Sequence, residues 1–261
     1  MVQSPPSAVF TVFGGSRDLI FVGSRNSVSL LPNKLYALRL SDGGVLGPIG
    51  VVNGQPAVDQ VAKRVYFASR AFGAFPNDRT VWCLDLETGS PCPGFAPQAH
   101  GDIDTGVSLY GGQLLVGTND PKVKAIRTSD GGEDWFYPLP SLEGAPKGYV
   151  AVDRFTGNAY FSTASTVWSL NAAGTERWNC PSLGSPSTPV YAPGDLYVYV
   201  GAGDGKLYRL DVSSGAPVVA APFPLLLGDG SAGVGSPTFD LGASFVYVGT
   251  EDGTIYAVQL P

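Results

Sequence analysis

The sequence predicts an all-β fold, a single β-propeller of six blades over residues 1–261, and three observations support this prediction. Hairpin-like segments recur along the 261 residues. Gly and Pro number 35 and 22, and 44% of the residues are hydrophobic, which is typical of short strands joined by tight turns. The recurring unit has room for four strands in about 44 residues, which is the size of a propeller blade.

The hairpin is clearest near the C-terminal end of the chain. Residues 245–260 read FVYVGTEDGTIYAVQL, and residues 197–211 read YVYVGAGDGKLYRLD. In both segments an Asp-Gly pair separates two alternating runs, and this pattern predicts a β-hairpin whose glycine supplies the positive φ of the turn. Six equivalent positions span 220 residues in five steps, a mean period of 44: Tyr36, Trp82, Lys124, Trp168, Tyr208 and Tyr256.

Each repeat also predicts the remaining strands of a four-stranded blade. A short apolar strand precedes the hairpin, and a turn with a fourth strand follows it. The last repeat reaches Pro261 after its third strand, so we expect the sixth blade to lack a fourth strand of its own. An open strand edge invites pairing, so we expect an upstream segment or another chain to complete this blade. The repeats cover approximately residues 7–54, 55–104, 105–147, 148–185, 186–235 and 236–261.

One segment resembles a known repeat family. Residues 83–89 read CLDLETG, which is similar to the Ala-x-Asp-x-x-Thr-Gly segment of the pyrroloquinoline-quinone-like (PQQ-like) repeat β-propellers. In that family a Trp four residues after this glycine docks between blades. Trp135 and Trp178 stand at that distance from Gly131 and Gly174, so the resemblance implies docking in two blades. The other copies have different residues at this position: Gly47, Pro93 and Val219.

Composition and charge limit the classes of partner. Charged residues make up only 15% of the chain and the formal net charge is −6, which argues against nucleic-acid binding. No apolar run is long enough to span a bilayer, and no signal peptide is visible. The family resemblance nevertheless implies an extracytoplasmic bacterial protein, periplasmic, secreted or on the cell surface.

The sequence offers few catalytic or cofactor-binding residues. Quinone enzymes of the family have an adjacent Cys-Cys pair, whereas the three cysteines here are Cys83, Cys92 and Cys180. The single histidine, His100, precludes a site with several histidine ligands, and we expect it in a solvated loop. We therefore expect no catalytic residue, no metal ligand and no bound cofactor. A quinone- or metal-dependent oxidoreductase, or a hydrolase acting in the channel, is the alternative.

Two cysteines form a candidate disulfide. If Glu87 and Thr88 form the turn, residues pair so that their numbers add to 175, and Cys83 faces Cys92. A bulge at Gly89 would shift this register by one. The alternative, a pair of reduced core thiols, stays open.

Two enlarged loops predict a protein-binding surface. In repeats one and two the link from second to third strand expands to residues 24–34 and 69–79, whereas repeats five and six have tight Asp-Gly turns. Apolar and basic side chains in such loops are typical of binding surfaces. The predicted partner-binding residues are Leu30, Leu31, Arg70, Phe72, Phe75 and Arg79. The link from repeat five to six adds a third apolar loop, residues 225–227. The alternative is that these residues fold back as small satellite cores.

These observations favour a non-catalytic binding or scaffold module. We expect it to mediate protein–protein interaction as a subunit of a larger extracytoplasmic assembly. Neither a nucleic acid nor a direct membrane span is expected.

Overall fold

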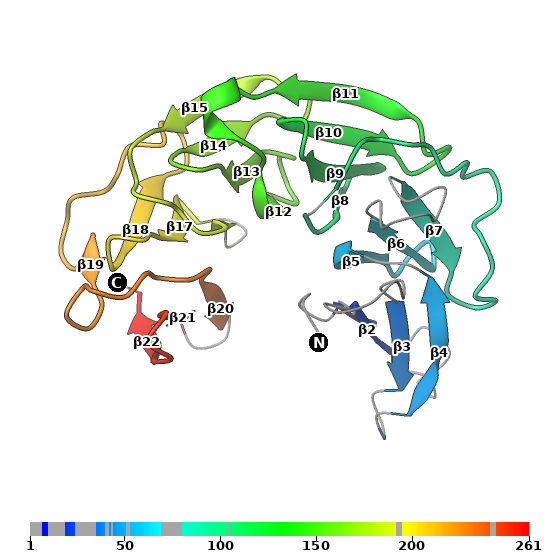
Figure 1. Cartoon of the computed structure of the whole chain (residues 1–261), viewed down its shortest axis with the longest axis horizontal. Coiled ribbons are helices and arrows are strands. Elements are labelled where there is room, and N and C mark those ends of the chain that lie inside the picture. Colours follow the sequence, from blue (N-terminus) through cyan, green and yellow to red (C-terminus); the bar gives the residue numbers. More distant parts are fainter. Residues whose placement is uncertain are drawn as a thin grey trace. The chain divides into compact units, whose positions relative to one another are not determined.

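The computed structural model describes residues 7–9, 19–23, 35–39, 42, 44–50, 53–68, 80–103, 105–191, 195–240 and 244–260. This part of the chain is all-β apart from one short 3₁₀ helix, η1 (Ser141–Glu143) (Figure 1). Contacts divide the chain into two compact units, Met1–Pro138 and Leu139–Pro261. Each unit is built from antiparallel sheets whose strands follow one another in chain order.

Unit 1 contains three sheets in its described residues. The first is β1–β4, the second β5–β7 and the third β8–β11. Their bounds are β1 (Ser7–Val9), β2 (Leu19–Gly23), β3 (Leu35–Arg39), β4 (Val45–Gly50), β5 (Asn53–Asp59), β6 (Arg64–Ala68), β7 (Val81–Asp85), β8 (Ser108–Tyr110), β9 (Gln113–Thr118), β10 (Lys122–Arg127) and β11 (Glu133–Pro138). The opening strands of neighbouring sheets are in contact, β1 with β5 and β5 with β8, and β2 also contacts β5.

Unit 2 likewise contains three sheets in its described residues. The fourth sheet is β12–β15, the fifth β16–β19 and the sixth β20–β22. Their bounds are β12 (Lys147–Val152), β13 (Ala159–Ser162), β14 (Val167–Leu170), β15 (Glu176–Cys180), β16 (Val190–Tyr191), β17 (Tyr197–Gly201), β18 (Lys206–Asp211), β19 (Leu225–Leu226), β20 (Thr238–Asp240), β21 (Phe245–Gly249) and β22 (Ile255–Gln259). The opening strands β12 and β16 are in contact.

The period-2 pattern of the strands buries both faces of the inner sheets. In the fifth sheet Val198, Val200 and Leu210 pack against the fourth sheet. Tyr199 and Leu207 point to the other face and pack against the sixth sheet. Burying one such Val or Leu side chain contributes about 1.5–3 kcal/mol, so this alternation is a main source of the packing between successive sheets.

The second sheet differs from the predicted four-stranded blade. Residues 90–99 follow β7 where a fourth strand was expected, but their pairing consists of two isolated bridges, Thr80 with Ala99 and Leu84 with Pro91, instead of a continuous strand ladder. Three prolines in this stretch, Pro91, Pro93 and Pro97, have no N–H to donate to a strand ladder. The loss of these donors explains why the fourth strand is interrupted.

The apolar link from repeat five to six is also not the loop that was expected. Leu225 and Leu226 form β19, the fourth strand of the fifth sheet, and pair with Leu207 and Lys206. Leu227 is buried in the core between the fifth and sixth sheets. The run is apolar because it closes a sheet, so it is not part of a loop surface.

The residue that begins the turn after the third strand differs between the sheets. In the second and fifth sheets an Asp begins it, and the backbone N–H of Thr88 donates to Asp85 Oδ1 at 2.8 Å. This bond is the main reason that the pKa of Asp85 is lowered. In the first and third sheets an Arg stands in its place and forms an ion pair with the Asp three residues later, Arg39 with Asp42 and Arg127 with Asp130.

The Asp-Gly hairpins have the predicted geometry. Gly205 has a φ of 76° and Gly253 a φ of 87°, the left-handed region that the turn requires. The backbone N–H of Gly205 donates to the carbonyl of Ala202, and that of Gly253 to the carbonyl of Thr250. These two turns therefore need no bound ion to explain their glycines.

Candidate interaction surface

The predicted partner-binding residues all lie outside the described residues. The strands that bound them are described, and they confirm that both segments link the second strand of a sheet to the third. Gly23 pairs with Leu35, the residues on either side of 24–34, and Ala68 pairs with Val81, the residues on either side of 69–80. In the fifth sheet the same link is only residues 202–205. The first two sheets therefore carry the long versions of a link that is otherwise short.

The candidate disulfide joins the middle of β7 to the segment that follows it. Cys83 and Cys92 are joined in the structure, with their Cα atoms 5.4 Å apart. The backbone N–H of Asp85 donates to the carbonyl of Ser90, so residue numbers in this turn add to 175 as predicted. Gly89 takes a φ of 68° without shifting that register. The third cysteine, Cys180, is free and buried.

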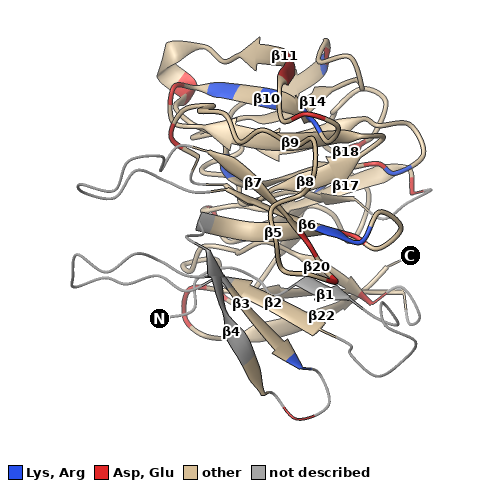
Figure 2. Cartoon of the chain, turned by 90° about the vertical axis from the view of Figure 1, so that its right-hand side faces the viewer, with Lys and Arg blue, Asp and Glu red and all other residues tan. Residues whose placement is uncertain are grey.

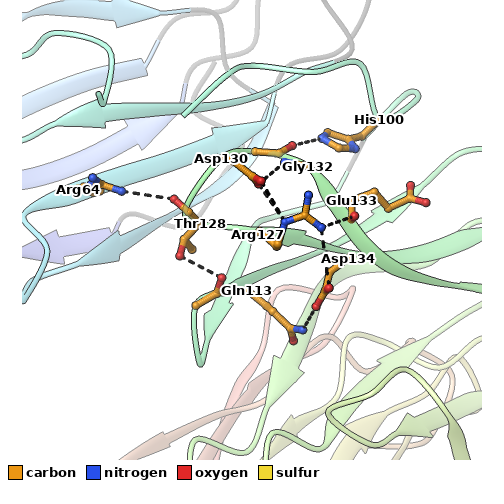
Figure 3. A network of polar contacts seen from close by, with 11 residues as sticks. Arg64, His100, Gln113, Arg127, Thr128, Asp130, Gly132, Glu133 and Asp134 are labelled. Atoms are coloured by element: carbon orange, nitrogen blue, oxygen red, sulfur yellow. Dashed lines mark hydrogen bonds and ion pairs between the residues drawn. The ribbon is translucent and has the colours of Figure 1, made fainter. Parts of the chain in front are cut away.

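His100 is buried, so the expectation of a solvated loop histidine is wrong. Its side chain is 3% exposed, and its Nε2 lies 2.9 Å from the carbonyl oxygen of Gly131 (Figure 3). Burial lowers the pKa of His100, and this effect outweighs the hydrogen bond to Gly131, which raises it. The ring therefore fastens the segment after β7 to the turn between β10 and β11.

Charged and polar groups around that turn bind one another. The Arg127 guanidinium donates to Asp130 at 3.0 Å and to the carbonyl of Glu133 at 2.7 Å (Figure 3). Arg64 on β6 donates across from the second sheet to the carbonyl of Thr128 at 3.3 Å. The network joins the second and third sheets, and within it the Arg127 guanidinium is paired with Asp130 and Asp134, so we interpret it as a structural tie between sheets.

Aromatic side chains dock on glycines of the following sheet. Trp178 on β15 lies against Gly215, where an added Cβ would come within 2.4 Å of the indole. The indole Nε1 donates to the carbonyl of Val212 at 2.8 Å. Phe95 takes the equivalent place against Gly131. The spacing of the repeats predicts Pro93 at this docking position and does not indicate Phe95. The interrupted fourth strand shifts the docking residue by two positions.

Two exposed apolar side chains mark the other end of the strands in unit 2. Phe155 and Leu196 stand in the links from first to second strand of the fourth and fifth sheets, and they are 67% and 68% exposed. The Arg154 guanidinium lies 4.9 Å from the centre of the Phe155 ring. The sequence analysis did not single them out, since an isolated apolar residue in a turn carries no periodic signal.

Charge gives no further site in the described part of the chain. Lys and Arg lie mostly singly, on strands and in turns, and β10 carries the clearest run of them (Figure 2). Among the described residues no group of three or more His, Cys, Asp or Glu is placed to hold a metal ion. None of the helical residues described forms a segment long and apolar enough to cross a membrane.

Comparisons with known proteins bear on this geometry. Residues 18–221 match a PQQ-like repeat family model described as outer membrane protein assembly factor BamB. The chain belongs to this family. No curated protein matches the chain.

Two solved structures extend the family assignment to the fold. The crystal structure of BamB from Moraxella catarrhalis has a TM-score of 0.54 at 16% identity, over 95% of this chain and 80% of that one. The crystal structure of the computationally designed Ika8 protein has a TM-score of 0.69 at 15% identity, over 99% of this chain and 72% of that one. These likenesses show a propeller-like all-β fold built from PQQ-like repeats.

Proposed function

We propose that this chain is a non-catalytic protein-binding module, a propeller scaffold within an extracytoplasmic assembly. The observation that carries the proposal is the family match over residues 18–221, whose model is described as an assembly factor. In this proposal the six sheets are six blades of a propeller and no cofactor is required. A fold alone does not fix a function, so the binding surface has to be argued separately.

The binding surface follows from the enlarged links of the first two sheets. Both links continue from paired strand ends, which supply a rigid base for residues 24–34 and 69–79. Binding residues are often found on loops held by such a scaffold. The Arg and Phe residues of these links are the types that most often carry interface energy, so we assign the contact to Arg70, Phe72, Phe75 and Arg79, with Leu30 and Leu31 beside them.

An extracytoplasmic location is consistent with the cysteine chemistry. Disulfides persist in oxidising compartments and are rare in the cytosol. The bonded pair Cys83 and Cys92 thus supports placing this chain outside the cytoplasm. The family, through the outer-membrane assembly factor, suggests the same compartment.

The test is a binding assay on the double variant Phe72→Ala with Phe75→Ala. The native partner is first identified by purifying the tagged chain from its source, and its affinity is then measured for each variant. Truncation of an interface anchor typically costs about 1–3 kcal/mol, which is roughly a 5- to 150-fold loss of affinity. The melting temperature should change little, because the paired strands beneath the loop stay intact.

Phe155→Ala is the matched control, since it removes an exposed Phe from the opposite end of the strands in unit 2. It should leave affinity unchanged. A double variant that melts earlier but binds normally would refute the assignment and favour a satellite core.

A further inference from the structure

One segment of unit 1 docks on the next sheet without the support of a strand. Residues 90–99 follow β7, and they pair with the second sheet through two isolated bridges instead of a ladder. In the fourth sheet the docking residue Trp178 stands on β15, which is paired with β14 at four positions. Phe95 docks in the same way, but in the sequence it lies between the two bridges. The position of Phe95 therefore depends on contacts other than a strand ladder.

Three groups of this segment contact the turn between β10 and β11. A Cβ added at Gly131 would meet the Phe95 ring at 3.2 Å. The backbone N–H of Ala96 donates to the carbonyl of Asp130 at 3.0 Å. The His100 ring reaches the carbonyl of Gly131 from the far end of the segment (Figure 3). These contacts join the second sheet to the third, and all of them depend on where the segment lies.

The disulfide lies at the start of this segment. Cys92 stands three residues before Phe95 and is joined to Cys83 on β7. The backbone N–H of Cys92 also donates to the carbonyl of Cys83 at 3.1 Å. Both cysteine side chains are buried, in the same core cluster as Phe95. The bond therefore fixes the segment to its own sheet, next to the residue that docks on the following sheet.

The fifth sheet has the same turn without a disulfide. Arg209 and Val218 stand there in place of Cys83 and Cys92, and in both sheets an isolated bridge to a proline comes directly before the second position. The backbone N–H of Val218 donates to the carbonyl of Arg209 at 2.8 Å, as in the cysteine pair. The chain then continues into β19, which pairs with β18. The disulfide thus occurs in the sheet whose fourth segment, described throughout residues 90–99, forms no strand.

We propose that the disulfide between Cys83 and Cys92 takes the place of the missing ladder, so that docking of this segment on the third sheet is redox-dependent. A dithiol reductant breaks the S–S bond and becomes a disulfide itself, while two electrons and two protons convert the cysteines to thiols. Thiols behave as small hydrophobic groups, so they remain in the core and the strands persist. For a sequence separation of 9, loop entropy favours the docked segment by about a hundredfold in the oxidised chain.

The experiment follows amide hydrogen exchange by NMR in the oxidised chain and after reduction with dithiothreitol. The amide of Ala96 is the direct reporter, because its hydrogen bond crosses from the second sheet to the third. We expect its exchange to become about tenfold to a hundredfold faster on reduction, while the amides of β6 and β7 keep their protection. Alkylation under denaturing conditions checks that reduction is complete, since the three cysteines then all react instead of Cys180 alone.

Substitution of both bonded cysteines provides a second test. Cys83→Ala with Cys92→Ala is suitable, because Ala125 occupies the position of Cys83 in the third sheet. In this variant the Ala96 amide should exchange as fast as in the reduced wild type, with or without dithiothreitol. Cys180→Ala is the matched control. It keeps the disulfide and should respond to the reductant as the wild type does.

Either of two results would overturn the proposal. One is an Ala96 amide that exchanges at the same rate in the oxidised and the fully reduced chain, which would mean that Phe95 and His100 hold the segment without the bond. The other is a loss of protection throughout β5–β7 on reduction, since the disulfide would then stabilise the whole sheet. Neither result bears on the partner assay with Phe72 and Phe75, because that assay uses the oxidised chain.

Discussion

At the residue scale, the burial of His100 depends both on residues near it in the sequence and on residues of the next sheet. The sequence places it in a link between repeats, where a histidine is usually solvated. The three prolines before it prevent a regular fourth strand, so the link runs back along β7, as its bridge from Ala99 to Thr80 shows. His100 then enters the core and binds the carbonyl of Gly131. No pattern in the sequence around His100 indicates this contact.

Burial of His100 predicts a pH dependence of stability. Its pKa is lowered on folding, so the unfolded chain takes up a proton at a higher pH than the folded chain does. The contribution of His100 to the free energy of unfolding is fully present above the unfolded-state pKa of about 6.5. It is lost as the pH falls from there towards the lowered pKa of the folded state. His100→Gln keeps a hydrogen-bond donor for Gly131 but does not titrate.

Urea denaturation at pH 7, 6 and 5 measures this effect. As the pH is lowered, the wild type should lose stability relative to His100→Gln. The difference between their free energies of unfolding should change by at most about 1.4 kcal/mol per pH unit for one proton. Carboxylates titrate in both proteins and cancel in this comparison. Two parallel pH curves would show that His100 does not contribute to acid sensitivity.

At the element scale, an aromatic residue on a glycine turn joins successive sheets within each unit. Trp178 rests on Gly215 in unit 2, and Phe95 rests on Gly131 in unit 1. Each glycine has a positive φ, so it is required both by backbone conformation and by the ring above it. The indole bond to Val212 adds a directional contact.

This arrangement predicts different costs for two similar substitutions. Gly215→Ala places a Cβ within 2.4 Å of the Trp178 ring and strains a φ of 72°, so it should destabilise unit 2 by about 2–4 kcal/mol. Gly89→Ala strains a similar φ of 68° but meets nothing within 4 Å, so it should cost only about 1–2 kcal/mol. Denaturant unfolding of both variants gives the comparison. Equal costs would mean that the ring does not rely on this glycine.

The hairpins were predictable from the sequence because the residues that specify each hairpin lie close together in the chain. Alternating apolar residues and an Asp-Gly pair specify two strands and a turn within about fifteen residues, and the predicted second and third strands are present in all six sheets. The fourth strands were less predictable, since Pro91, Pro93 and Pro97 interrupt one and Leu225–Leu226 form another that resembles a loop. Their form depends on contacts with the next sheet, which local patterns do not encode.

At the scale of the whole molecule, repetition explains both the fold and the candidate surfaces. Within unit 1 the second sheet packs on the first and the third, and within unit 2 the fifth sheet packs on the fourth and the sixth. The links from second to third strand are longest in the first two sheets. The length of these links, which the sequence shows directly, is why we predict the partner surface there, whereas exposed turn residues such as Phe155 and Leu196 required the structure.

The central claim, a binding module that uses the long links of its first two sheets, is tested most directly by hydrogen–deuterium exchange on the native complex. Mass spectrometry would compare the chain alone with the chain bound to its purified partner. The account predicts slower exchange in peptides covering residues 24–34 and 69–79, with no change in the turns that hold Phe155 and Leu196. Protection of those two turns, with residues 24–34 and 69–79 unchanged, would contradict it.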